Sequence, residues 1–239
     1  MEKNRIKTTP NFNDFYLNGA DVVDVDPSFN AELYGLIVAE SFVGNGRIQN
    51  PVWDKEYHEQ GIDQYIEGKQ PYIDFFKKLI KEPYFDYWNY IYGDFDEIHI
   101  NINKVRRGGS LPWHFDGYDG TFLQILCYPN IEDFVESDGG HLLIGRPEFI
   151  SSKNDPFPHW DPKSSLDRIP CKNIKVTKRY VPSRNNVVIL NNIDPSFVHR
   201  VTELETDKSR HTIIATLGYK SLWRGNKIKS GYYRDIQLV

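Results

Sequence analysis

Cysteine and methionine are scarce in this sequence, and no charge of one sign dominates it. The 239 residues contain two cysteines, Cys127 and Cys171, and one methionine. Two thiols are too few for a disulfide framework or a zinc site made of cysteines, so a metal ion would have to be held by histidine and carboxylate side chains. The formal net charge of −4 argues against a protein whose main role is to bind the phosphate backbone of nucleic acids.

Long apolar runs are missing too. No segment approaches the ~18 to 20 consecutive apolar residues of a membrane helix, and residues 1–6 lack the apolar stretch of a signal peptide. We therefore expect a cytoplasmic protein without a membrane partner. Aromatic residues, by contrast, are abundant: 15 Tyr, 14 Phe and 5 Trp provide enough apolar surface to fill the core of a folded domain.

The first 95 residues have a helical pattern. Asp26 and Pro27 are suited to the N-cap and first position of a helix that Gly44 can end. Apolar residues recur with helical spacing from Pro71 to about Lys81, which predicts a second helix that the next proline stops. We expect residues 1–95 to form a helical extension that packs on the rest of the chain.

Beyond residue 95 the pattern becomes that of short strands. Runs rich in β-branched residues are separated by Gly, Pro, Asn and Asp, which predicts an antiparallel sandwich or barrel over residues 96–239. Residues 151–173 are rich in proline and predict a long surface insertion. The expected strands cover residues 98–102, 121–128, 141–144, 174–180, 187–190, 197–204 and 211–217.

One short motif has the spacing of a metal site. His114 and Asp116 are two residues apart, and on an extended strand such residues point to the same face, where they could bind one metal ion. The alternative is a buried histidine hydrogen-bonded to a nearby carboxylate. A second His-x-Asp, at His159 and Asp161, lies among prolines in the predicted insertion and is interpreted as a loop feature.

Residues far downstream complete the pattern. With His199, the motif would form a face of two histidines and one carboxylate, which binds Fe(II) and leaves coordination positions open. Arg210 and Thr212 share a strand face and could receive a carboxylate through a guanidinium fork and a hydroxyl. An open metal site beside an anion clamp predicts a site for a keto acid. Alternatively, Arg210 is a surface residue of a strand, paired with Glu203 or Glu205.

The relative orientation of His199 and Arg210 depends on how the chain between them folds. If residues 197–219 form a plain antiparallel hairpin, the two side chains share a face only when the loop has an even number of residues or a bulge is present.

Five motifs follow one another along the chain: Trp113–Asp116, Leu126–Asn130, Asp138–Leu142, Val187–Leu190 leading to His199, and Arg210–Thr212. With these motifs in this order, residues 96–220 resemble the Fe(II)- and 2-oxoglutarate-dependent dioxygenases, and most closely their prolyl 4-hydroxylase-like branch. The resemblance implies a double-stranded β-helix, or jelly roll, packed against helices. It also implies that His114, Asp116 and His199 are the iron ligands and catalytic residues.

The same resemblance implies a co-substrate site. Arg210 and Thr212 would bind the distal carboxylate of 2-oxoglutarate, and Tyr128 is a candidate for a further co-substrate contact. Three positions depart from the family pattern. Val105 stands where a tyrosine is common, His141 follows the Gly-Gly pair where an acidic residue is common, and Lys208 and Ser209 precede Arg210 where Gly-x is common.

The activity that the resemblance implies is hydroxylation of a C–H bond, with Fe(II) as cofactor, 2-oxoglutarate and O₂ as co-substrates, and succinate and CO₂ as products. A peptidyl residue, an amino acid and a small metabolite all remain open as substrates. Two other functions also remain open. One is a non-catalytic jelly-roll module that binds a ligand or protein. The other is a nucleobase or nucleic-acid oxygenase. The negative net charge argues against it, although residues 104–107 and 220–229 contain small basic clusters. The sequence gives no indication of oligomeric state.

Overall fold

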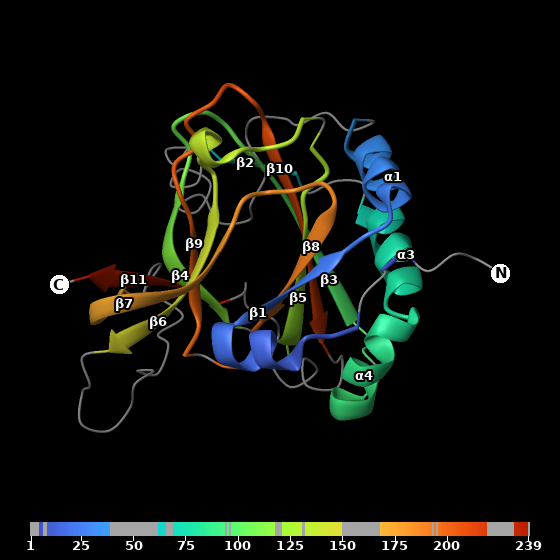
Figure 1. The fold of residues 1–239 in the computed structure, drawn as a ribbon, viewed down its shortest axis with the longest axis horizontal. Coiled ribbons are helices and arrows are strands. Elements are labelled where there is room, and N and C mark those ends of the chain that lie inside the picture. Colours follow the sequence, from blue (N-terminus) through green and yellow to red (C-terminus); the bar gives the residue numbers. More distant parts are fainter. Residues whose placement is uncertain are drawn as a thin grey trace.

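Two β-sheets face each other in the computed structural model, and helices α1, α3 and α4 cover the outside of one of them (Figure 1). The structure describes residues 5–6, 9–38, 62–65, 69–93, 95, 97–117, 121–130, 132–149, 168–192, 194, 196–218 and 232–238. The described helices are η1 (Asp14–Asn18), α1 (Pro27–Val38), α3 (Lys69–Leu79), α4 (Pro83–Tyr92) and η2 (Glu136–Asp138). The described strands are β1 (Ala20–Asp24), β2 (Ile62–Tyr65), β3 (Glu97–Val105), β4 (Leu111–Gly117), β5 (Thr121–Cys127), β6 (Leu142–Phe149), β7 (Arg168–Tyr180), β8 (Asn186–Asn191), β9 (Val198–Val201), β10 (Arg210–Gly218) and β11 (Tyr232–Leu238).

The order of the strands defines the fold. The larger sheet runs β1-β8-β5-β10-β3-β2 and the smaller one β4-β9-β6-β7, with β11 paired to both β4 and β7. From β3 to β10 the chain crosses repeatedly between the sheets. Strands β8, β5, β10 and β3 of the larger sheet thus face β4, β9, β6 and β7 of the smaller one. This winding is the double-stranded β-helix, and it confirms the predicted fold class of a mostly β protein with a jelly-roll core packed against helices.

Each strand of the larger sheet has a helix-facing side and an inward side. Ile213, Ala215 and Leu217 of β10 belong to the apolar core beneath the helices, together with fully buried Phe76 and Trp88. Because side chains alternate along a strand, the residues between them face the smaller sheet. The helix layer therefore sets which face of β10 is turned toward the space between the sheets.

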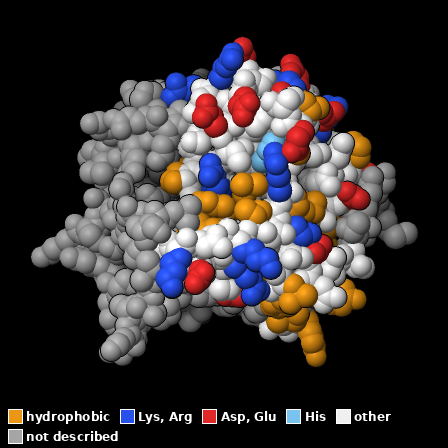
Figure 2. Space-filling view, turned by 60° about the vertical axis from the view of Figure 1, so that its left-hand side comes forward, with side chains coloured by type: hydrophobic (Ala, Val, Ile, Leu, Met, Phe, Trp, Pro, Cys, Tyr) orange, Lys and Arg blue, Asp and Glu red, His pale blue; other side chains and the backbone are white. Residues whose placement is uncertain are grey.

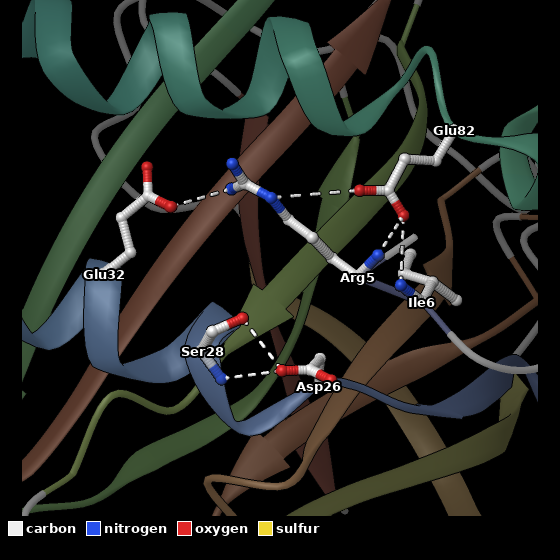
Figure 3. A network of polar contacts seen from close by, with 6 residues as sticks. All are labelled: Arg5, Ile6, Asp26, Ser28, Glu32 and Glu82. Carbon is white, nitrogen blue, oxygen red and sulfur yellow. Dashed lines mark hydrogen bonds and ion pairs between the residues drawn. The ribbon is translucent and has the colours of Figure 1, made fainter. Parts of the chain in front are cut away.

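The N-terminal helices follow the predicted pattern in part. Asp26 caps α1, since its Oδ1 accepts hydrogen bonds from the N–H of Ser28 at 3.1 Å and from its hydroxyl at 2.9 Å (Figure 3). The predicted end of this helix at Gly44 lies outside the described residues. The second predicted helix is α3. As predicted, this helix ends before Pro83, since its last residue is Leu79. The helix α4 was not predicted: Pro83 is its first residue, where the missing N–H is not needed.

A polar network ties the beginning of the chain to the helix layer (Figure 3). The carboxylate of Glu82, at the N-cap of α4, accepts the N–H groups of Arg5 at 2.9 Å and Ile6 at 3.0 Å. The Arg5 guanidinium pairs with Glu32 of α1 at 3.1 Å and lies 4.7 Å from the ring centroid of Phe75 in α3. One arginine thus contacts each of these helices.

The first 95 residues contribute more than the predicted helices. β1 pairs with β8, with Ala20 opposite Leu190, and β2 pairs with β3, so both join the larger sheet. A strand also begins inside the predicted insertion, because β7 starts at Arg168. The rest of that insertion, including His159 and Asp161, lies outside the described residues. None of the described helices combines the length and apolar character needed to cross a bilayer.

The outer face of the smaller sheet is apolar in its middle. Trp113, Val198 and Cys171 form a buried cluster there, against which Leu143 and Ile174 pack. Figure 2 views the molecule from the side that the smaller sheet occupies in Figure 1, and shows a band of hydrophobic side chains bordered by Lys and Arg.

Candidate functional site

Two predicted metal ligands turn into the space between the sheets. Trp113 and Val198 belong to the outer cluster of the smaller sheet, so the next residues, His114 and His199, point to the opposite, inward side. The register places His199 directly between His114 of β4 and Ile144 of β6. Ile144 belongs to the apolar cluster between the sheets, which confirms that this is the inward face.

The two imidazoles lie side by side, with ring centroids 4.1 Å apart and ring planes at 60°. The Nδ1–H of His114 donates to the backbone carbonyl of Pro112 at 2.8 Å. A carbonyl oxygen only accepts, so Nδ1 carries the proton and Nε2 holds the lone pair of the neutral ring. Histidine ligands of metals are commonly oriented in this way by a carbonyl behind them. A register shift between Leu111 and His114 accompanies this geometry.

The third predicted ligand is known only by its place in the strand. Asp116 lies in β4, where its backbone is opposite Tyr233 of β11, and strand alternation puts it on the same face as His114. Its side chain lies outside the described part of the structure. Among the side chains that are described, no group of three or more His, Cys, Asp or Glu is close enough to hold a metal ion.

Arg210 points inward from the larger sheet. Its side chain is 2% exposed, its Nε donates to the carbonyl of Gly140 at 2.7 Å, and its Nη1 donates to the hydroxyl of Thr212 at 2.6 Å. Its guanidinium carbon is 5.1 Å from the ring centroid of Tyr128. Within the described residues Arg210 forms no ion pair with a carboxylate. The alternative of a surface ion pair is therefore wrong.

A buried cation without an anion is an unusual arrangement. Arginine stays protonated in proteins, and a charge that is removed from water is costly unless it is paired. Burial lowers the pKa of the Arg210 guanidinium, and the neighbouring Tyr128 opposes this. Burial also raises the pKa of Tyr128 to about 12 against the influence of Arg210, so Tyr128 remains a neutral phenol. Its buried hydroxyl has no hydrogen-bond partner among the described residues.

The Gly-Gly pair of the predicted motif shapes the turn beside Arg210. Gly140 has φ of +64°, and a Cβ placed on it would lie 3.0 Å from Cδ of Arg210. A Cβ on Gly139 would lie 2.1 Å from the carbonyl oxygen of Glu203. Asp138 fixes the start of the turn by accepting the N–H of Val135 and an Nζ–H of Lys208, both at 2.8 Å.

The imidazoles and the guanidinium face the same space. Val105 lies opposite Arg210 in the larger sheet and packs in one cluster with Leu111 and Val201 of the smaller sheet. This cluster aligns the Arg210 end of β10 with the Leu111 end of β4. His114 is the next inward residue after Leu111 in β4, and His199 is the inward residue before Val201 in β9. The two histidines therefore lie one inward position from this cluster. The arrangement can hold a metal ion and an organic anion next to each other.

The sequence alone did not identify the backbone carbonyls of Pro112 and Gly140 as contacts of the site. Any residue has a carbonyl, and no sequence signal marks which one accepts a particular hydrogen bond. Val105 packs between the sheets and has no polar group to offer a ligand.

Comparison with known structures supports the class of fold. The chain shares its fold with a prolyl-4-hydroxylase from Pseudomonas putida (TM-score 0.51, 12% identity, 87% of this chain and 96% of that one). It also matches a prolyl hydroxylase from Trichoplax adhaerens in complex with a hypoxia-inducible-factor peptide fragment (0.53, 13%, 91% and 90%).

A third match is HygX from Streptomyces hygroscopicus with nickel, 2-oxoglutarate and hygromycin B bound (TM-score 0.52, 12% identity, 96% of this chain and 97% of that one). No protein-family model matches the sequence. No curated protein matches it either. At these identities the likeness establishes the jelly-roll fold alone.

Proposed function

We propose that this protein is an Fe(II)- and 2-oxoglutarate-dependent oxygenase that hydroxylates a C–H bond. His114, Asp116 and His199 would hold the iron, and Arg210, Thr212 and Tyr128 would bind the distal carboxylate of 2-oxoglutarate. The observation that carries the proposal is the buried Arg210 guanidinium, which has no carboxylate partner in the described structure and faces the same space as the paired imidazoles.

The residues suit both groups. Two imidazoles and a carboxylate are the ligand set of non-haem Fe(II) sites with open positions, and the His114–Pro112 hydrogen bond leaves the lone pair on Nε2. The orphaned hydroxyl of Tyr128 beside Arg210 suits an anion that is held by a neutral donor as well as by a cation. When bound, Fe(II) supplies the activation of O₂ that is coupled to decarboxylation of the keto acid to succinate.

The chain's own residues orient the keto acid. An arginine has five N–H groups, and Arg210 uses two of them, toward Gly140 and Thr212. The other three remain for a carboxylate. The hydroxyl of Thr212 accepts from Arg210, so its own proton is available to the same carboxylate. Anchoring one end of the diacid in a buried site directs its keto end toward the imidazoles and excludes water.

The proposed substrate is a peptidyl residue, an amino acid or a small metabolite. Proteins with this fold have been seen with a peptide fragment and with hygromycin B, which supports a site that opens to either kind of molecule.

The decisive test is anaerobic titration of the protein with Fe(II), with and without 2-oxoglutarate. We expect a weak visible charge-transfer band when both are present. In His199→Ala we expect no band and Fe(II) affinity at least about 100-fold lower, because loss of even an outer-shell partner of a metal ligand costs about 10- to 100-fold. Substrate-uncoupled succinate production should also disappear.

The matched control is His211→Asn, which changes the histidine next to Arg210 on the other face of β10. It should bind Fe(II) like the wild type. Wild-type protein that binds neither Fe(II) nor 2-oxoglutarate would reject the oxygenase and leave the non-catalytic jelly-roll module.

A further inference from the structure

Asn103 is a buried polar residue that the proposed function does not yet use. Its side chain lies on β3, is 7% exposed, and its Oδ1 has no hydrogen-bond partner in the described structure. A buried amide oxygen without a partner opposes folding, unless a ligand or an ordered water satisfies it. The position of Asn103 in the sheet indicates which ligand this is.

The strand register places Asn103 beside Arg210 and Thr212, the residues proposed to bind the distal carboxylate. Asn103 is directly opposite Thr212 of β10. On the other side of β10, Ile213 is opposite Cys127, so Tyr128 follows beside Thr212 on the same inward face. Asn103, Thr212 and Tyr128 thus form one row across three adjacent strands, one position along from Arg210.

The two ends of this row share a property. The Asn103 Oδ1 and the Tyr128 hydroxyl are both buried and both lack a partner in the described residues, whereas Thr212 between them accepts from Arg210. A single anion beside Thr212 would accept from the Tyr128 hydroxyl and pair with the guanidinium. It would bind Asn103 only through the amide nitrogen, because Oδ1 is itself an acceptor. A carboxylate has the charge for Arg210 and enough lone pairs for several donors.

We propose that Asn103 is a further binding residue for the co-substrate and donates from its amide to the distal carboxylate of the five-carbon keto diacid. This inference rests on the proposed function. A half-turn of the side-chain amide presents Nδ2 where Oδ1 now lies, and toward a carboxylate only the nitrogen is a donor. Asparagine also leaves the guanidinium unneutralised, whereas an aspartate here would compete with the ligand for Arg210.

The test measures ligand affinity by anaerobic calorimetry on Fe(II)-loaded protein. The two ligands are 2-oxoglutarate and 2-oxovalerate, a keto acid of the same chain length without the distal carboxylate. The variants are Asn103→Ala, Asn103→Asp and Asn101→Ala. The last is a matched control: Asn101 is two residues before Asn103, on the same face of β3, and its side chain is exposed.

We expect Asn103→Ala to weaken 2-oxoglutarate by about 10- to 100-fold, as for other hydrogen bonds to charged groups, and to leave 2-oxovalerate unchanged. Asn103→Asp should weaken 2-oxoglutarate further. Asn101→Ala should match the wild type. In turnover, the KM for 2-oxoglutarate should rise in Asn103→Ala while kcat at saturation stays close to the wild-type value.

A structural role for Asn103 would give a different pattern. Because its Oδ1 has no partner in the described fold, Asn103→Ala should melt at the same temperature as the wild type or higher when no ligand is present, whereas loss of a structural hydrogen bond would lower the melting temperature. If Asn103→Ala fails to fold, Asn103→Ser serves in its place.

The outcomes separate the two proposals. Wild-type affinity for 2-oxoglutarate in Asn103→Ala, or an equal loss for both ligands, overturns the role of Asn103 and leaves the oxygenase standing. A wild-type protein that binds Fe(II) but no 2-oxoglutarate overturns the proposed function itself.

Discussion

Arg210 and Asp21 are both buried ionisable side chains, but their surroundings differ. Arg210 is buried beside neutral partners in the space between the sheets, where an anion would complete it. Asp21 is buried on the other side of the larger sheet, 3% exposed, and accepts the N–H of Asn11 at 2.9 Å and the hydroxyl of Tyr84 at 2.8 Å. The carboxylate of Asp21 therefore has its partners within the fold, whereas the described residues offer the guanidinium of Arg210 no carboxylate partner.

The pH dependence of stability tests the environment of Asp21. Burial raises the pKa of Asp21, and its hydrogen bonds from Asn11 and Tyr84 oppose this only in part. The folded state then binds more protons than the unfolded state, so the free energy of unfolding should fall as the pH rises from about 4 through the raised pKa. We expect Asp21→Asn to flatten this fall in urea denaturation measured between about pH 4 and 7.

The control for that measurement is Asp24→Asn, at an exposed position of the same strand. An identical pH profile in Asp21→Asn and wild type would show that burial does not perturb Asp21.

At the scale of elements, the turn between η2 and β6 connects the two sheets. Gly140 donates its N–H to Glu203 at 2.8 Å and offers its carbonyl to Arg210 at 2.7 Å. Its positive φ and the short distance to Cδ of Arg210 both favour glycine. A turn of only a few residues therefore positions the guanidinium that the proposed co-substrate requires.

Substitution of this glycine should affect stability and binding together. We expect Gly140→Ala to destabilise the protein by about 1–3 kcal/mol, the cost of a strained backbone position, and to weaken 2-oxoglutarate binding by displacing Arg210. Chemical denaturation and calorimetry measure the two effects.

Gly35→Ala is the matched control, because Gly35 lies within α1 and nothing is within 4 Å of its added Cβ. It should stabilise the protein by roughly 0.5–1 kcal/mol. A Gly140→Ala protein as stable as the wild type would contradict the importance of the turn.

At the scale of the whole molecule, the helix layer and the inter-sheet site share one sheet. The larger sheet places Ile213 and Ala215 under the helices and Arg210 and Thr212 toward the smaller sheet. Loss of the helix layer would expose one face of that sheet and remove the constraint on which face is inward. Packing far from the site is thus a condition for the site.

Phe76 tests this dependence. It belongs to α3 and is fully buried in the core between the helices and the larger sheet. Phe76→Ala should lower the free energy of unfolding by about 3–5 kcal/mol through lost burial and a cavity. Tyr90→Ala, at a side chain that is 90% exposed, should stay within about 0.5 kcal/mol of the wild type. Equal stability of the two variants would refute a structural role for the helix layer.

Local patterns in the sequence predicted much of this architecture. The alternation of Ile98, Ile100 and Ile102 with polar residues predicted a two-faced strand, and β3 has those faces. The Asp26–Pro27 pair predicted the start of α1. α4 was missed because a proline that ends one helix can equally begin the next. β1 was missed as well, because its partner β8 is far away in the sequence.

The candidate site, too, was predicted from the sequence only in part. Residue types and spacing singled out His114, Asp116, His199, Arg210 and Thr212, because ligand chemistry and strand alternation are local properties. Tyr128 was a candidate only through the family resemblance. Only the tertiary structure decided that β9 and β10 lie in different sheets instead of forming a hairpin, so that His199 and Arg210 approach from opposite sides. It likewise decided that Asn103 joins Thr212 and Tyr128 in one row. Pairing between distant strands is a property of the folded chain, because it is set by the packing of whole sheets and not by neighbours in the sequence.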